Sequence, residues 1–148
     1  MSKDLLHKPS LYLSDFFERN RGSYYDALNA VRRSGDIGHW VRFFLNGVAQ
    51  TSRDGCDTFQ KILALRGHAE DSVLSFGRRA PSARQLLNLL YEKPIVSVTD
   101  VVRQLDTTAP TANELIRKFL ESGFLKETTG YQRNRVFVFE SYLNLFLN

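Results

Sequence analysis

The cysteine and the three histidines are the side chains of this sequence with the widest chemical repertoire. Cys56 is the single cysteine, and His7, His39 and His68 are dispersed through the first half of the chain. A structural zinc site needs cysteines and histidines at short, paired spacings, which these residues lack. One thiol cannot form an internal disulfide, so we expect Cys56 to be a small core residue. The pattern predicts no metal site and fits a reducing, cytoplasmic compartment.

Phosphate chemistry is not predicted either. A site that cradles phosphate needs several backbone N–H groups directed at one point, usually from closely spaced glycines at the start of a helix. The nine glycines of this chain stand singly. We therefore expect no nucleotide cofactor to be bound by this sequence.

Residues suited to binding DNA or protein gather near the C-terminal end. Lysine and arginine contact phosphates, whereas asparagine can make a bidentate contact to adenine, which here singles out Asn113. The candidate DNA- or protein-binding residues are Thr108, Thr111, Asn113, Arg117, Lys118, Lys126, Arg133 and Arg135. Arg133 and Arg135 have a second interpretation, because in an extended strand they share a side and can pair with Glu127 or Glu140.

The charge balance restricts the nucleic-acid interpretation. Net charge is +4; residues 1–76 hold ten Lys/Arg against nine Asp/Glu, and residues 77–148 hold ten against seven. Proteins that coat nucleic acid usually carry a denser positive stripe, because each neutralised phosphate releases counterions. Only a focused patch could bind DNA here.

Capping residues and periodicity predict the elements of residues 77–148. Ser82 and Gln85 form a capping box for one helix, and Pro94 ends it. A very short strand follows over Ile95–Val98. The next helix is capped by Ser97 or Thr99, and a tight turn at Asp106 and Thr107 leads to a helix capped by Thr108, with Pro110 in its first turn and Gly123 at its end. A first strand over 124–127 and a second over Val136–Phe139 then form a hairpin.

This order of helix, turn, helix and hairpin is that of a winged helix-turn-helix, in which the hairpin is called the wing. Residues 1–76 predict helices instead: one from Ser14 to Asn20, one from Ser23 to Gly35, and a long helix or two in series from about Ile37. At 1.5 Å per residue a continuous helix to Phe76 would be about 60 Å long and would need another part of the chain, a second copy or another protein to cover it. We predict a mainly α fold with a helical domain over 1–76 and a winged helix domain over 77–148.

A family resemblance covers most of the chain. The run from Leu5 to Val48, with KPSLYLS, SYYDAL and WVRFFLNGV, resembles the segment that follows the catalytic motif in Fic family proteins. The run from Ile95 to Leu143 is similar to the winged helix that many longer bacterial Fic proteins append at their C-terminus. Fic proteins transfer AMP from ATP to a hydroxyl side chain of a target protein, through a loop of the form HPFxxGNGR.

That loop is absent from this sequence. His7 is followed by Lys8, His39 by Trp40 and His68 by Ala69, so no histidine has the required neighbours. The resemblance therefore implies a noncatalytic C-terminal module, not an enzyme, whose winged helix serves protein recognition, dimerisation or regulation. The alternative is a winged-helix DNA-binding transcriptional regulator.

Composition adds two further expectations. No stretch approaches the roughly 18 apolar residues that a membrane helix requires, so no membrane partner is expected. The aromatic stripe of Trp40, Phe43 and Phe44 lies at helical spacing. If it is not core, it leaves an apolar patch that a homodimer would cover.

Overall fold

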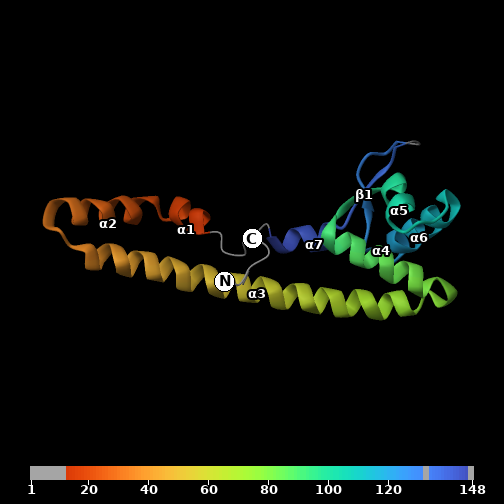
Figure 1. Cartoon of the computed structure of the whole chain (residues 1–148), viewed down its shortest axis with the longest axis horizontal. Helices are drawn as coiled ribbons and strands as arrows, with labels where there is room; N and C mark the ends of the chain where they lie inside the picture. The colour runs from red at the N-terminus through yellow and green to blue at the C-terminus, as the bar shows by residue number, and fades with distance from the viewer. Residues whose placement is uncertain (1–12, 132–133, 147–148) are drawn as a thin grey trace, which may run out of the picture. The chain divides into compact units, whose positions relative to one another are not determined.

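The computed structural model describes residues 13–131 and 134–146, and over these residues the fold is mainly α, as predicted (Figure 1). A three-stranded antiparallel sheet completes it. The helices are α1 (Leu13–Arg19), α2 (Arg21–Ser34), α3 (Ile37–Leu74), α4 (Ala80–Glu92), α5 (Val98–Gln104), α6 (Ala109–Glu121) and α7 (Glu140–Leu143), with 3₁₀ turns η1 (Gly77–Arg79) and η2 (Asn144–Phe146). The strands are β1 (Ile95–Ser97), β2 (Lys126–Glu127) and β3 (Val136–Val138).

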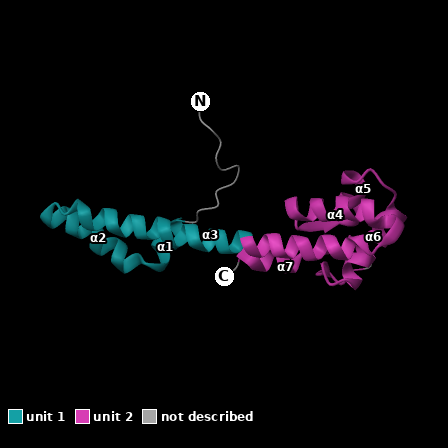
Figure 2. Ribbon diagram, turned by 90° about the horizontal axis from the view of Figure 1, so that it is seen from below, with its two compact units in different colours: residues 1–59 teal, residues 60–148 magenta. Residues whose placement is uncertain are grey.

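The chain divides into two compact units, one up to Phe59 and one from Gln60 (Figure 2). The domain boundary expected after residue 76 lies inside unit 2. The physical reason is that Ala69 and Val73 of α3 are 0% and 1% exposed and belong to the same core as α4 and α6. The second half of the chain thus covers the end of the long helix.

Local capping explains where the helices of unit 1 begin and end. Gly35 ends α2 in the left-handed conformation, with φ 68°, and its N–H donates to the Val31 carbonyl at 3.0 Å. Asp36 then begins α3, because its Oδ1 accepts the His39 N–H at 3.1 Å. The predicted stop at Gly35 is confirmed, and α3 is one continuous helix. Ser14 lies inside α1 and does not cap it, since α1 already begins at Leu13.

A cluster of aromatic side chains packs the helices of unit 1 together. Phe17 stacks on Tyr24 at 5.4 Å and on Phe43 at 5.9 Å between ring centroids, and Trp40 lies 5.9 Å from Phe43. These rings are half-buried, so the predicted aromatic stripe serves as the core of unit 1 and also reaches its surface. Gly47 lets α1 approach α3, because a Cβ there would lie 2.6 Å from the Phe16 ring.

The helices of unit 2 largely follow the predicted caps. Ser97 caps α5 through a capping box with Asp100, and Thr108 caps α6 with Pro110 in its first turn. The tight turn between them has Asp106 at φ 47°, and Gly123 follows α6 at φ 75°. Helix α4 begins at Ala80, two residues before the predicted cap Ser82.

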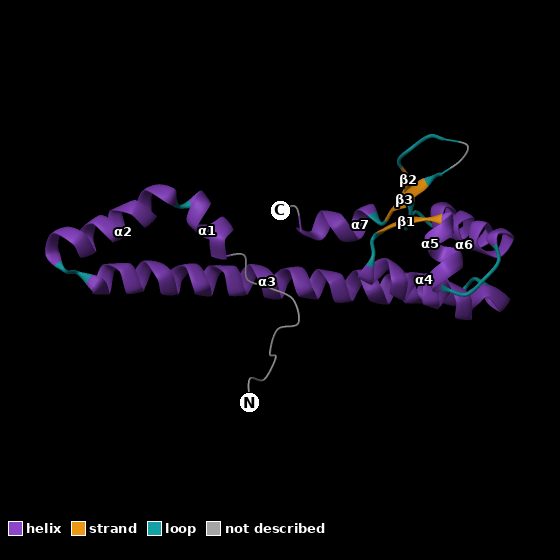
Figure 3. Ribbon diagram, turned by 45° about the horizontal axis from the view of Figure 1, so that its top comes forward, coloured by secondary structure: helices purple, strands orange, loops and turns teal. Residues whose placement is uncertain are grey.

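The sheet has three strands, one more than the predicted hairpin (Figure 3). Its order is β1-β3-β2, and Phe137 of β3 stands opposite Val96 on one side and Glu127 on the other. The strand predicted over 124–127 is shorter, because the N–H groups of Phe124 and Leu125 both donate to the Phe119 carbonyl at the end of α6. Their side chains are buried and extend the core from α6 to the sheet.

Candidate functional site

The predicted binding residues at the start of α6 are engaged with their own helix. The Thr108 hydroxyl accepts the Thr111 N–H at 3.4 Å and lies 3.0 Å from the Thr111 hydroxyl. The Asn113 amide donates to the Ala109 carbonyl at 2.9 Å, although the residue is exposed. This bond uses one of the two amide hydrogens of Asn113 and orients the side chain along its own helix.

The two cations of α6 are also partnered. Arg117 donates to Glu121 one turn along the helix, with 2.6 Å between Nη1 and Oε1. Lys118 lies with its ammonium 5.2 Å from the centroid of the Phe76 ring, a cation–π arrangement. On the same side of the helix, Glu114 pairs with Arg79 at 2.6 Å. The acids thus offset most of the positive charge of α6.

The strands place Lys126 and Arg135 against acids as well. Lys126 Nζ lies 3.0 and 3.1 Å from the two carboxylate oxygens of Glu140. Arg135 donates to Glu127 across the strand pair, and its guanidinium lies 5.1 Å from the Phe137 ring centroid. Arg135, hydrogen-bonded to Glu127, holds the pKa of that carboxyl below its ordinary value. The pairing interpretation is confirmed for Arg135, and Arg133 lies outside the described residues.

The loop between β2 and β3 is fixed at its base. Thr129 Oγ1 accepts the Val136 N–H at 3.2 Å, and the Thr128 N–H donates to the Val136 carbonyl at 3.1 Å. Gly130 and Asn134 adopt φ 63° and 54°, the left-handed conformation that glycine and asparagine tolerate best. Tyr131 is 67% exposed. The loop therefore presents an aromatic side chain from a well-anchored base.

Taken together, the described candidate residues and the acids that pair with them present little net charge. The exposed residues of α6 are Ala109, Pro110, Asn113, Arg117 and Glu121, of which only the last two are charged, and these pair with each other. Such a surface suits contact with a protein, because interfaces between proteins are depleted of unpaired charge and enriched in aromatic residues such as tyrosine. Dense positive potential, which DNA binding requires, is not provided by these residues.

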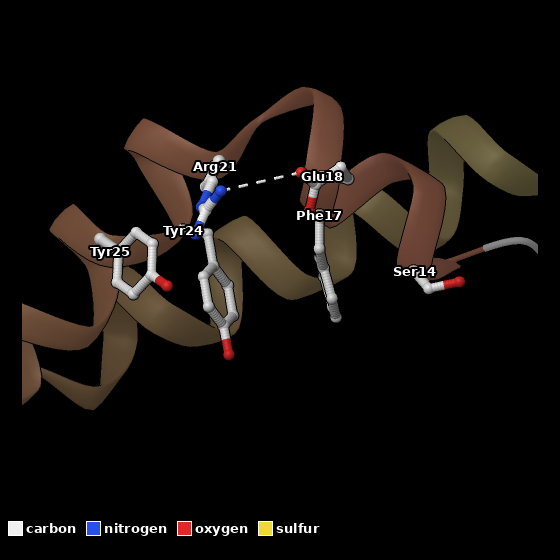
Figure 4. Close-up of a pocket in the computed structure, with 6 residues that line it drawn as sticks. All are labelled: Ser14, Phe17, Glu18, Arg21, Tyr24 and Tyr25. Atoms are coloured by element: carbon white, nitrogen blue, oxygen red, sulfur yellow. Dashed lines mark ion pairs between the residues drawn. The ribbon is translucent and has the colours of Figure 1, made fainter.

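A second candidate lies in unit 1, where an open cleft of about 310 Å³ runs along α1 and α2 (Figure 4). Its lining residues are Ser14, Phe17, Glu18, Arg21, Tyr24 and Tyr25. Arg21 lies 3.9 Å from Glu18 and 5.8 Å from the Tyr25 ring centroid. Hydrogen bonding to Tyr25 is the main cause that raises the pKa of Arg21. The sequence did not single out this cleft, because it depends on the bend between the consecutive helices α1 and α2.

Cys56 differs from its prediction. Its side chain is exposed on α3, so the expectation of a small core residue is wrong. The reason is helical phase: Gly47 and Thr51 take the buried side of this stretch of α3, and Cys56 does not continue their row. Residues 13–131 and 134–146 hold no group of three or more His, Cys, Asp or Glu side chains that could bind a metal ion.

Sequence reasoning missed half of the acids that offset these cations. Glu127 and Glu140 were weighed as partners, but Glu114 and Glu121 were not. The spacing of Arg117 and Glu121 was the available signal, since residues four apart share a helix face. A comparison with protein-family models found no match to the chain. Within the described part of the chain, no helix is both long and apolar enough to cross a membrane.

Proposed function

We propose that the chain is a noncatalytic module of a Fic-type protein AMP transferase, in which unit 2 is a winged helix that recognises protein. In this proposal α5 and α6 form the helix-turn-helix, and β2, β3 and their loop form the wing. The surface of α6 and the wing receives a protein partner, either the catalytic part of such an enzyme or a second copy of this chain. The cytoplasm is the proposed compartment.

The pairing of cations with acids is the observation that favours a protein partner over DNA. Arg117, Lys126 and Arg135 each donate to a carboxylate of the same surface. A phosphate backbone would have to displace these acids and would also meet their repulsion. The resemblance to Fic proteins supports the type of partner, and the absence of an HPFxxGNGR loop supports a noncatalytic role.

Binding to random duplex DNA tests this proposal and yields the first prediction. We expect no binding at about 50 mM salt by the native chain, measured by fluorescence anisotropy. The variant Glu121→Gln/Glu127→Gln frees Arg117 and Arg135, and we expect it to bind DNA weakly and with a steep salt dependence. Glu92→Gln/Asp57→Asn is the control with an equal charge change, because it neutralises two exposed acids that form no ion pair among the described residues. Tight, salt-sensitive binding by the native chain would favour a DNA-binding regulator instead.

A photo-crosslinking residue at Asn113 tests for the protein partner in cells. We expect an adduct with a protein that carries the HPFxxGNGR loop or with a second copy of the chain, and no adduct from the exposed control position Ser52 on α3. Crosslinking of Asn113 to nucleic acid would contradict the proposal. ATP binding or self-modification by the isolated chain would contradict its noncatalytic part.

A further inference from the structure

The middle of α3 belongs to neither hydrophobic core. The buried residues of this helix lie in its first part, at Gly47 and Thr51, and in its last part, at Ala69 and Val73. None of residues 52–64 is buried. Most helical stability in proteins comes from the packing of an apolar face, so a helical stretch that is not buried depends on its own residues.

Residues 52–58 are poor helix formers with little side-chain support. In this stretch, SRDGCDT, every residue except Arg53 ranks below alanine, leucine and lysine in helix propensity. Within the described chain, the one side-chain hydrogen bond of the stretch joins Gln50 to Asp54 at 2.9 Å. Arg53 and Asp57 stand four residues apart, but in the weaker order for such a pair, and they form no ion pair among the described residues. The continuous helix is therefore weak at this point.

The same stretch carries the signals that end one helix and begin another. Gly55 suits the left-handed position just past a helix C-terminus, and Arg53 would then stand in the last turn, where a cation is favourable. Asp57 suits an N-cap, and Gln60, three residues later, completes a capping box ahead of an apolar run. An interruption at residues 55–57, which we call the hinge, thus has a cap on each side.

Opening the hinge exposes no core residue. The buried residues of α3 end at Thr51 and resume at Ala69, so both cores stay intact when the helix is interrupted between them. A few exposed backbone hydrogen bonds are lost, and the caps and the regained chain entropy offset that loss. The division of the chain into compact units, after Phe59, falls two residues beyond the hinge. The interrupted helix therefore competes with the continuous one.

We propose that α3 is a two-state element, which opens at the hinge into one helix ending near Asp54 and another beginning after Asp57. Opening lets the residues before and after the hinge move independently while each core stays folded. The hinge is then the place in α3 where local unfolding starts and where a protease first reaches this helix. This device needs no partner and does not rest on the proposed function.

Hydrogen exchange of the amides of residues 56–60 in the full chain measures how often the hinge opens. We expect these amides to exchange at least about tenfold faster than those of residues 69–73, which lie beside the core of unit 2. Asp57→Ala removes the N-cap of the open state and improves helix propensity, so it should slow exchange at residues 56–60 by at least about 5-fold. Equal protection along the whole of α3 would overturn the hinge.

Asp54→Ala separates a capped hinge from a helix that is merely weak. Both alanine variants remove an exposed aspartate and gain the same propensity, but Asp54 does not cap the second helix of the open state. We expect Asp54→Ala to slow exchange by no more than about 3-fold. Asp57→Asn keeps an N-cap oxygen and should match the native chain within about 2-fold. Equal slowing by the two alanine variants, or clear slowing by Asp57→Asn, would contradict the proposal.

Thr58→Pro provides an independent test, because it should hold the hinge open. Proline is favourable at the first position of the second helix, whereas in the continuous helix it would remove a hydrogen bond and clash with the preceding turn. We expect the variant to stay folded, with native Trp40 fluorescence and unchanged protection of the amides of residues 69–73. Loss of either signal would show that the cores do not survive an open hinge, and the proposal would be wrong.

Discussion

At the scale of single residues, Gly47 is a position in unit 1 where one added carbon would have a large effect on packing. A Cβ there would lie 2.6 and 2.7 Å from two atoms of the Phe16 ring, closer than real contacts allow. Helix α1 would have to move away from α3, which would weaken the aromatic packing of Phe16 and Phe17. The close approach of the two helices therefore depends on this glycine.

The variant Gly47→Ala should lower the free energy of unfolding of unit 1 by about 1–3 kcal/mol, the usual cost of overpacking. Urea unfolding followed by Trp40 fluorescence measures the effect close to the change. Gly67→Ala in the same helix is the matched control, since nothing lies within 4 Å of a Cβ there. This control should be neutral or stabilise α3 by about 0.5–1 kcal/mol through helix propensity. Equal stability of the two variants would contradict the close approach.

Asp100 is a second residue whose role can be measured. Its carboxylate accepts from Lys93 at 2.7 Å and from the N–H and hydroxyl of Ser97 at 2.9 and 2.7 Å. The hydrogen bond from Lys93, followed by those from Ser97, lowers the pKa of Asp100 to about 2. The same carboxylate completes the capping box of α5.

Because the folded-state pKa of Asp100 is lower than the unfolded value of about 3.9, its contribution is fully present above pH 4. That contribution is lost as pH falls from about 4 to about 2. Asp100→Asn should lower the free energy of unfolding by about 1–2 kcal/mol at pH 7. The difference between variant and native chain should shrink toward pH 2. Chemical denaturation at several pH values measures it, and a difference that persists unchanged at pH 2 would contradict the assignment.

At the scale of elements, capping residues predicted more of the observed helix ends than hydrophobic periodicity did. Ser97, Thr108 and Gly123 stand where the structure has the start of α5, the start of α6 and the end of α6, because their side chains or φ angles act on their own neighbours. Strand β1 could not be assigned a partner from sequence, since pairing with β3 joins residues 39 to 43 positions apart. The pair Arg79–Glu114, 35 positions apart, was not predictable for the same reason. The cleft along α1 and α2 is local in sequence but depends on the bend between the two helices.

The helix α3 shows how element and unit boundaries can differ. The glycine and proline near residues 77–81 do interrupt the helix, and α3 ends at Leu74. The core of unit 2 nevertheless includes Ala69 and Val73, so the end of the helix belongs to the folded unit. Glycine and proline indicate where a helix stops. Whether the side chains of its last turns are buried depends on distant parts of the chain.

At the scale of the whole molecule, this packing predicts which fragment folds. A fragment of residues 60–148 retains Ala69 and Val73 and should unfold cooperatively on heating. A fragment of residues 77–148 lacks both residues and exposes the buried faces of α4 and α6 that they cover, so it should melt at a clearly lower temperature or remain partly folded. Circular dichroism melts compare the two. Equal melting temperatures would show that α3 adds nothing to the core of unit 2.

The exposed position of Cys56 affects how the protein can be labelled and how it must be purified. As the single thiol of the sequence, it offers one reactive handle on the solvent side of α3. A maleimide dye or spin label should attach stoichiometrically to the native protein without prior denaturation. In air, the same thiol would join two molecules covalently, so purification without a reductant should yield a dimer that dithiothreitol reverses.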